Sequence, residues 1–143
     1  MIAIINGPNL NLLGKRQPEI YGTETFEHVL KELREKFPLC AIEYFQSNSE
    51  GEIIDKLHQL GYESHECKGI IINPGAYSHY SYAIADAIAA INVPVVEVHI
   101  SNIMSREDFR HRSVTAKNCR GIISGLGTEG YALALHYLLK NES

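Results

Sequence analysis

The sequence lacks several features that would place it in a special class of protein. No apolar run approaches the roughly 20 residues that a membrane-spanning helix needs, so we expect no membrane segment. The net charge is -4 with neutral histidines, so there is no broad basic surface to bind nucleic acid. The first residues show neither a basic region nor the cleavage site of a secretory signal, and we therefore expect a cytoplasmic protein.

Common metal-binding and nucleotide-binding motifs are missing as well. The three cysteines, Cys40, Cys67 and Cys119, are odd in number and form no C-x-x-C pair, which favours reduced thiols over a metal site or disulfides. The motifs G-x-x-x-x-G-K-[ST] and H-E-x-x-H are absent, which argues against an ATPase and that class of zinc enzyme. Residues 125–130 read GLGTEG, but a dinucleotide fingerprint needs a further strand, and the chain ends first. We interpret this stretch as a tight entry into a helix.

What is present is a regular alternation of short apolar runs with amphipathic stretches, in a length that suits one domain, residues 1–143. The expected strands cover residues 2–5, 40–45, 69–73, 93–98 and 121–124. The expected helices cover residues 26–36, 49–60, 83–91 and 131–139. Thr23 or Thr25 is the candidate cap of the first helix, Asn48 or Ser49 begins the second, and Gly61 is expected to end it.

Nearly continuous apolar strands separated by helices predict a parallel sheet that is covered on both faces. Five such units in this length predict an α/β fold, a flavodoxin-like doubly wound five-stranded sheet. Sheets of this kind bind ligands at the carboxyl ends of their strands. The residues that follow each strand are therefore the place to look for chemistry.

A long connection follows the first strand. Residues 7–22 exceed the two to six residues usual for such a connection, and their prolines and asparagines favour defined turns. We expect a functional lid loop here, and the alternative is a surface excursion without a role.

Polar residues also follow the third and fourth strands. Gly75 lets the backbone approach a ligand closely. Glu97 and His99 lie two residues apart on one strand face, so the carboxylate could orient the imidazole. A lone buried histidine is more often structural. Arg106 and Arg110, four residues apart, suit a carboxylate ligand, although a solvated basic face explains their spacing equally well.

At these residues the chain resembles the type II 3-dehydroquinate dehydratases, or type II dehydroquinases. The matching blocks are INGPNL at 5–10, RQPEIYG at 16–22, INPGAYSH at 72–79 and VEVHISN at 96–102. The resemblance covers essentially the whole chain. It implies dehydration of 3-dehydroquinate to 3-dehydroshikimate in the shikimate pathway of aromatic amino acid biosynthesis. It also implies no metal, no organic cofactor and a homododecamer built from trimers.

The resemblance further implies a role for each matching residue. Tyr21 is the base and Arg16 assists it, His99 is the acid and Glu97 orients it, and Asn9 lies near the enolate. The implied substrate contacts are Asn73, Gly75, His79, Asp86, Ile100, Ser101, Arg106 and Arg110. Asp86 is expected to reach a neighbouring subunit's site. Gln17 departs from the family pattern, in which Glu is common beside the key arginine.

These residue types suit the chemistry. A proton α to a ketone needs a base, and an arginine beside a tyrosine favours the phenolate. Hydroxide is a poor leaving group, and a protonated histidine can supply its proton. A Schiff-base route would need a lysine at a buried strand end, whereas the nearest, Lys15 and Lys68, lie at edges. A nucleotide-binding module and a purely structural oligomer are the competing interpretations.

Overall fold

The computed structural model describes residues 1–21 and 23–141, without the side chains of residues 20 and 21. Its centre is a parallel sheet with the strand order β2-β1-β3-β4-β5, which is the flavodoxin-like order, so the predicted fold class is confirmed. The strands are β1 (Ile2–Asn6), β2 (Ile42–Gln46), β3 (Gly69–Asn73), β4 (Val95–His99) and β5 (Gly121–Ser124).

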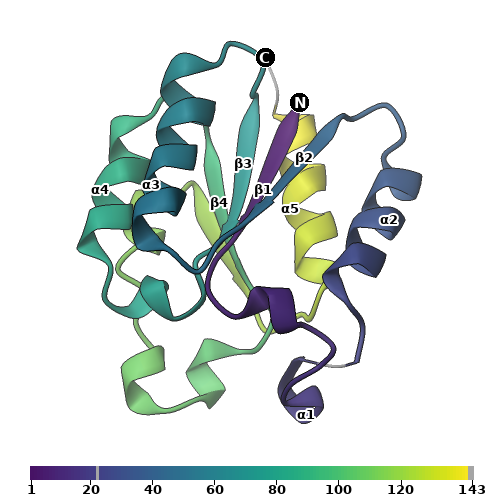
Figure 1. Ribbon diagram of the computed structural model, residues 1–143, viewed down its shortest axis with the longest axis vertical. Helices are drawn as coiled ribbons and strands as arrows, with labels where there is room; N and C mark the ends of the chain where they lie inside the picture. The colour runs from purple at the N-terminus through teal and green to yellow at the C-terminus, as the bar shows by residue number, and fades with distance from the viewer. Residues whose placement is uncertain (22, 142–143) are drawn as a thin grey trace.

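Helices cover both faces of the sheet (Figure 1). The helices α2 (Phe26–Lys36) and α5 (Glu129–Lys140) pack on one face, and α3 (Glu50–His58) and α4 (Tyr82–Ala90) pack on the other. Residues of β1 alternate between the two layers: Ile2 and Ile4 belong to the core under α2 and α5, and Ala3 and Ile5 to the core under α3 and α4. Residues 2–5 of β1 are therefore all apolar, as the sequence pattern indicates.

Two of the predicted helix starts are confirmed, and one predicted stop is wrong. Thr25, not Thr23, caps α2, and Ser49 caps α3, each through a side-chain oxygen that accepts a backbone N–H. Gly61 does not end its helix, because a π-helical turn (Gln59–Glu63) continues past it. A β-carbon at Gly61 would lie 2.6 Å from the β-carbon of Ile91, so glycine serves close packing there rather than termination.

Two strands begin two residues later than expected. β2 begins at Ile42, because the Cys40 N–H closes a turn on the Phe37 carbonyl at 3.0 Å. β4 begins at Val95 and runs on to His99, which places that histidine at the carboxyl end of the strand. The GLGTEG stretch is a tight turn into α5, since Gly125 and Gly127 both have positive φ.

The long connections gather at the carboxyl ends of the strands, at the end of the sheet opposite the amino terminus (Figure 1). Residues 7–22 contain a 3₁₀ turn (Leu10–Leu12) and the short helix α1 (Pro18–Tyr21). Further 3₁₀ turns are Gly75–His79 after β3, and Ile103–Ser105, Asp108–Arg110 and Ala116–Asn118 after β4. In the part of the chain that the structure describes, no helix is long and apolar enough to cross a membrane.

Candidate active site

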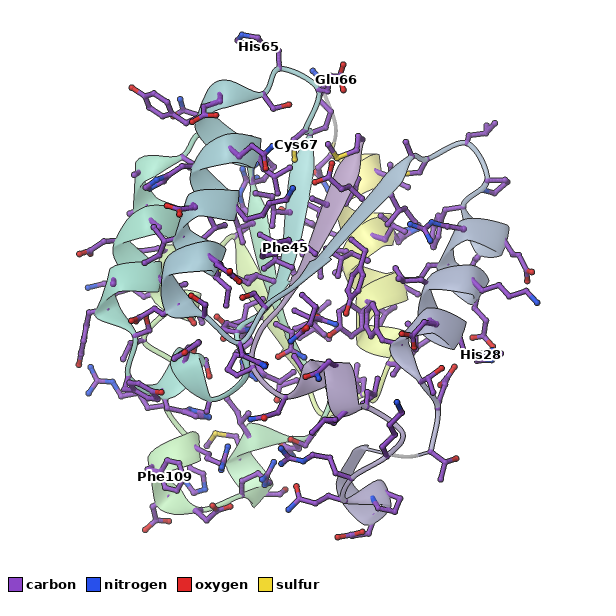
Figure 2. The ribbon with its side chains drawn as sticks, viewed as in Figure 1. His28, Phe45, His65, Glu66, Cys67 and Phe109 are labelled. Atoms are coloured by element: carbon purple, nitrogen blue, oxygen red, sulfur yellow. The ribbon has the colours of Figure 1, made fainter. Side chains whose placement is uncertain are left out.

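A pocket of about 100 Å³ opens among these connections, at the carboxyl ends of β1, β3 and β4. It is lined by Pro8, Asn9, Leu10, Leu13, Arg16, Asn73, Gly75, Ala76, His79, His99, Ile100, Ser101, Ile103, Arg106 and Arg110. The position of the pocket can be followed from Phe109, the residue before Arg110. Figure 2 shows Phe109 and Cys67 at opposite ends of the sheet. The fold thus brings together most of the candidate residues from three separate segments, which follow β1, β3 and β4.

The imidazole of His99 is bound to a buried carboxylate. Its Nε2 lies 2.7 Å from Oε2 of Glu97, whose side chain is fully buried. The same oxygen accepts a hydrogen bond of 2.6 Å from the Ser113 hydroxyl, and the Thr115 hydroxyl donates to the other oxygen, Oε1. With Nε2 held by Glu97, the other ring nitrogen of His99, Nδ1, is the one available to a ligand.

The ring of His79 lies beside that of His99, with the ring centroids 6.4 Å apart. Its Nδ1 lies 2.8 Å from the carbonyl oxygen of Arg112, so this nitrogen carries the proton and Nε2 is an acceptor. Burial lowers the pKa of His79, an effect that the Arg112 carbonyl partly opposes. The two histidines therefore differ in their partners: His79 binds a neutral carbonyl, and His99 binds a carboxylate.

Two arginines reach the pocket from the segment after β4. Arg106 donates through Nη1 to the Ser101 hydroxyl at 3.1 Å. Arg110 donates through Nε to Glu107 at 3.2 Å and lies 4.8 Å from the centroid of the Phe109 ring. The two do not share one helical turn, because Arg106 ends one 3₁₀ turn and Arg110 belongs to the next. Both still line the pocket, and the Glu107 carboxylate lies near each of them.

The loop after β1 supplies Asn9 and Arg16. Asn9 has a left-handed backbone (φ 71°), and its N–H donates to Oδ1 of Asn48 at 3.0 Å. Arg16 lines the pocket and donates through Nη2 to Oε1 of Gln17 at 2.9 Å. Tyr21 is the last residue of α1, and its side chain lies outside the described part of the structure. The pairing of Arg16 with Tyr21 therefore stays a prediction.

Asn73 and Gly75 form the wall contributed by β3. The Gly75 N–H donates to Oδ1 of Asn73 at 3.1 Å. Gly75 has φ 61°, and a β-carbon there would lie 3.2 Å from the Pro8 carbonyl oxygen, so another residue would be strained and crowded. Asp86, in contrast, lies on the exposed surface of α4 and does not line this pocket.

Sequence reasoning missed two sets of residues at the site. One is the apolar lining formed by Pro8, Leu10, Leu13, Ala76 and Ile103. The other is the hydroxyl pair that holds Glu97, for which the available signal is the alternation of Ser113 and Thr115 around Val114. A carboxylate in a strand of a sheet that is covered on both faces needs hydrogen-bond donors, and nearby hydroxyl residues are the candidates.

The described residues offer few ligands for a metal near the pocket. The cluster with closely spaced ligand atoms is Glu24, His28 and Glu32, at the start and on the exposed surface of α2. These side chains form ion pairs with one another, with His28 Nε2 at 2.8 Å from Glu32 and 3.6 Å from Glu24. None of them lines the pocket.

A doubly wound parallel sheet with a histidine–carboxylate pair and arginines at its strand ends defines an acid–base enzyme that acts on an anionic substrate. Residues 1–139 match the family described as dehydroquinase class II, and the chain belongs to that family. The predicted resemblance is thereby confirmed, and with it the enzyme class, a hydro-lyase.

Known proteins of this family match the chain over nearly its whole length. A 3-dehydroquinate dehydratase of Caldicellulosiruptor bescii is 56% identical over 139 residues, which is 96% of this chain and 94% of the relative. A 3-dehydroquinate dehydratase of Thermotoga neapolitana is 52% identical over 99% of this chain and 96% of its own length. The crystal structure of a type II dehydroquinase from Butyrivibrio crossotus has a TM-score of 0.90 and 48% identity, and the match covers 96% of each chain.

Proposed function

We propose that the protein removes water from 3-dehydroquinate to give 3-dehydroshikimate, a step of the shikimate pathway of aromatic amino acid biosynthesis. The observation that carries this proposal is the joint position of His99, held by the buried Glu97, and of Arg16, Arg106 and Arg110 in one pocket. No aspartate or glutamate is among the described residues that line it. The site therefore combines an acid–base group with a positive surface for a carboxylate substrate.

Binding of the substrate falls to the wall and the rim of the pocket. Arginine binds a carboxylate through two parallel hydrogen bonds, and both Arg106 and Arg110 line the pocket. Asn73, His79 and Ser101 supply the polar atoms that can bind the hydroxyl, carbonyl and carboxylate oxygens of a small ring.

In the first step Tyr21, as a phenolate, takes the proton from the carbon α to the ketone, and the C–H electron pair becomes an enolate. Arg16 favours the phenolate by its positive charge, and Asn9, which lines the same pocket, donates a hydrogen bond to the enolate oxygen in this scheme. In the second step the enolate reforms the ketone and expels the β-hydroxyl as water, with the proton supplied by His99. The C–O bond breaks and a carbon–carbon double bond forms, so no oxidant or reductant is needed.

His99 delivers that proton through Nδ1, because Nε2 is bound to Glu97. The carboxylate stabilises the protonated imidazole and fixes its orientation, and general acid catalysis of this kind contributes about 10²–10⁴-fold to a rate. Before the next turnover Tyr21 gives its proton to solvent and His99 takes one up, so the cycle neither gains nor loses a proton.

Two other interpretations fit the pocket less well. A Schiff-base mechanism would need a lysine, and no lysine is among the described residues that line it. A nucleotide-binding module would use a glycine-rich turn at phosphates, but the residues of the GLGTEG turn are not in the lining, and about 100 Å³ suits a small ring better than a dinucleotide.

The assembly and location of the protein form part of the same proposal. The exposed Asp86 of α4 suits a contribution to a neighbouring subunit's site, within a dodecamer of trimers. We propose further that the reaction needs no metal and no organic cofactor, and that the protein works in the cytoplasm.

The decisive test is to mix the purified protein with 3-dehydroquinate and to follow the absorbance of the conjugated enone. The variant Tyr21→Phe should still bind the substrate but lose both turnover and exchange of the α-hydrogen with deuterated solvent. The variant His99→Ala should lose turnover by at least about 10²-fold and keep that exchange, because the base remains. His65→Ala, at an exposed position remote from the pocket, is the control and should behave as the parent protein. No product from the parent protein would refute the proposed function.

A further inference from the structure

A chain of four buried or half-buried polar side chains runs from the pocket wall into the core beneath α2 and α5. It begins at Asn73 of β3, whose Nδ2 donates to the hydroxyl of Tyr131 in α5 at 2.9 Å. The Tyr131 hydroxyl donates to Oδ1 of Asn6 in β1 at 2.8 Å. Nδ2 of Asn6 faces the hydroxyl of Tyr44 in β2 at 3.4 Å. Four separate elements thus meet in one hydrogen-bonded row.

The direction of this row is fixed at one end by the backbone. The Gly75 N–H can only donate, and it lies 3.1 Å from Oδ1 of Asn73, which must therefore be the acceptor. Asn73 then turns Nδ2 toward Tyr131, so the phenol oxygen accepts there and gives its single proton to Asn6. Every donor and acceptor in the row therefore follows from the backbone N–H of Gly75, which can only donate.

The core holds Tyr131 in place. The residue is fully buried, and its ring packs edge-on against Phe26 with centroids 4.9 Å apart and an interplanar angle of 73°. Phe26 in turn stacks on Tyr44 at 4.8 Å. Burial raises the pKa of Tyr131, so the residue stays a neutral phenol with one proton to give.

This arrangement decides what Asn73 offers to a ligand. Its Oδ1 is occupied by Gly75 and one N–H by Tyr131, which leaves the second N–H of the amide for the pocket that Asn73 lines. We propose that Tyr131 is a positioning residue of the dehydration site, which holds the Asn73 amide so that it presents a hydrogen-bond donor to an oxygen of the substrate. The proposal rests on the proposed function of the pocket.

The test is Tyr131→Phe, which removes the phenol oxygen and keeps the ring. Without this hydroxyl the Asn73 amide is held only at Oδ1, by the Gly75 N–H, and Nδ2 can move out of position, so KM for 3-dehydroquinate should rise about tenfold. Because Asn73 binds substrate and moves no proton, kcat should stay within about threefold. The matched control is Tyr44→Phe, which removes a hydroxyl from the far end of the same row and leaves Tyr131 and Asn73 in contact. Its KM should be unchanged.

A double-mutant cycle separates positioning from a general loss of stability. If Tyr131 acts through Asn73, Tyr131→Phe should add nothing to KM in an Asn73→Ala background. Additive effects on KM, or an equal rise in Tyr44→Phe, would overturn the proposal. Thermal unfolding of each variant shows that the assays use folded protein.

A second readout does not depend on activity. The side-chain amide protons of Asn73 can be followed by NMR in isotope-labelled protein, with the signals assigned by their loss in Asn73→Ala. In Tyr131→Phe these signals should shift and exchange faster with solvent, and in Tyr44→Phe they should not. Unchanged signals in Tyr131→Phe would refute the positioning role. The same shift in a protein that makes no product would leave that role intact and refute the proposed function instead.

Discussion

Oε2 of Glu97 lies 2.7 Å from Nε2 of His99, and both side chains are buried at the carboxyl end of β4. Two hydroxyls also donate to Glu97, so its carboxylate has hydrogen-bond partners within the protein and is held in place away from bulk water. Because Nε2 of His99 is bound to Glu97, Nδ1 is the ring nitrogen available to a ligand.

The variant Glu97→Gln tests this relationship. Glutamine keeps the shape and removes the negative charge that stabilises a protonated His99, so kcat should fall about 10²-fold with little change in KM. Steady-state assays measure both constants, and thermal unfolding verifies the fold. Glu35→Gln, on the exposed surface of α2, is the control. A kcat close to that of the parent protein would show that the pair has no part in the chemistry.

Two pocket arginines should differ in what they contribute. Arg16→Gln removes the charge proposed to favour the Tyr21 phenolate, so kcat should fall about 10²-fold while KM stays similar. Arg110→Gln removes a proposed carboxylate contact, and KM should rise about tenfold with kcat nearly intact. Both variants are measured with 3-dehydroquinate over a range of concentrations. The same pattern in the two variants would contradict the separate roles.

The lowered pKa of His79 should make the free energy of unfolding depend on pH. Burial lowers the pKa of His79, and the positive charges of His99 and Arg110 act in the same direction, while the Arg112 carbonyl and Glu97 oppose it. In the unfolded chain the pKa of this histidine is near the ordinary value for histidine, 6.5. The neutral form therefore favours the folded state above this pH, and its contribution is lost as pH falls through the lower folded pKa.

Urea unfolding at a series of pH values from 7.5 downward measures this effect. The variant His79→Gln should lose less of its unfolding free energy below pH 6.5 than the parent protein does. His65→Gln, at an exposed position, should keep the parent slope. A steeper loss in His79→Gln would reverse the assigned sign.

Gly75→Ala should destabilise the fold by about 1–3 kcal/mol, because alanine is strained at positive φ and crowds the Pro8 carbonyl. Gly121→Ala is the matched control, since a β-carbon there meets nothing within 4 Å. Urea unfolding compares the two variants. Equal stability in both would mean that the turn after β3 adjusts without cost.

Much of the fold could be predicted because its signals are local. Apolar runs mark β1 and β3, and Thr25 and Ser49 mark helix starts by their side-chain chemistry. The predicted helix stop at Gly61 was wrong. A sequence does not distinguish a glycine that is needed for close packing against another residue from a glycine that ends a helix. The residue that Gly61 packs against, Ile91, is distant in sequence.

The site divides in the same way. Glu97 and His99 could be paired from their spacing on one strand, whereas the hydroxyls of Ser113 and Thr115 reach Glu97 from another segment. The row from Asn73 through Tyr131 to Asn6 joins residues from three distant elements, and no spacing rule predicts it. Contacts of this kind come from the packing of the whole sheet.

The backbone N–H that orients Asn73 is present for every residue at position 75 except proline, so few single substitutions can reverse the order of donors and acceptors behind it. A change at Asn6 or Tyr131 alone leaves a neighbour without a partner. During evolution these positions are expected to change together or remain fixed, even though Tyr131 is absent from the pocket lining.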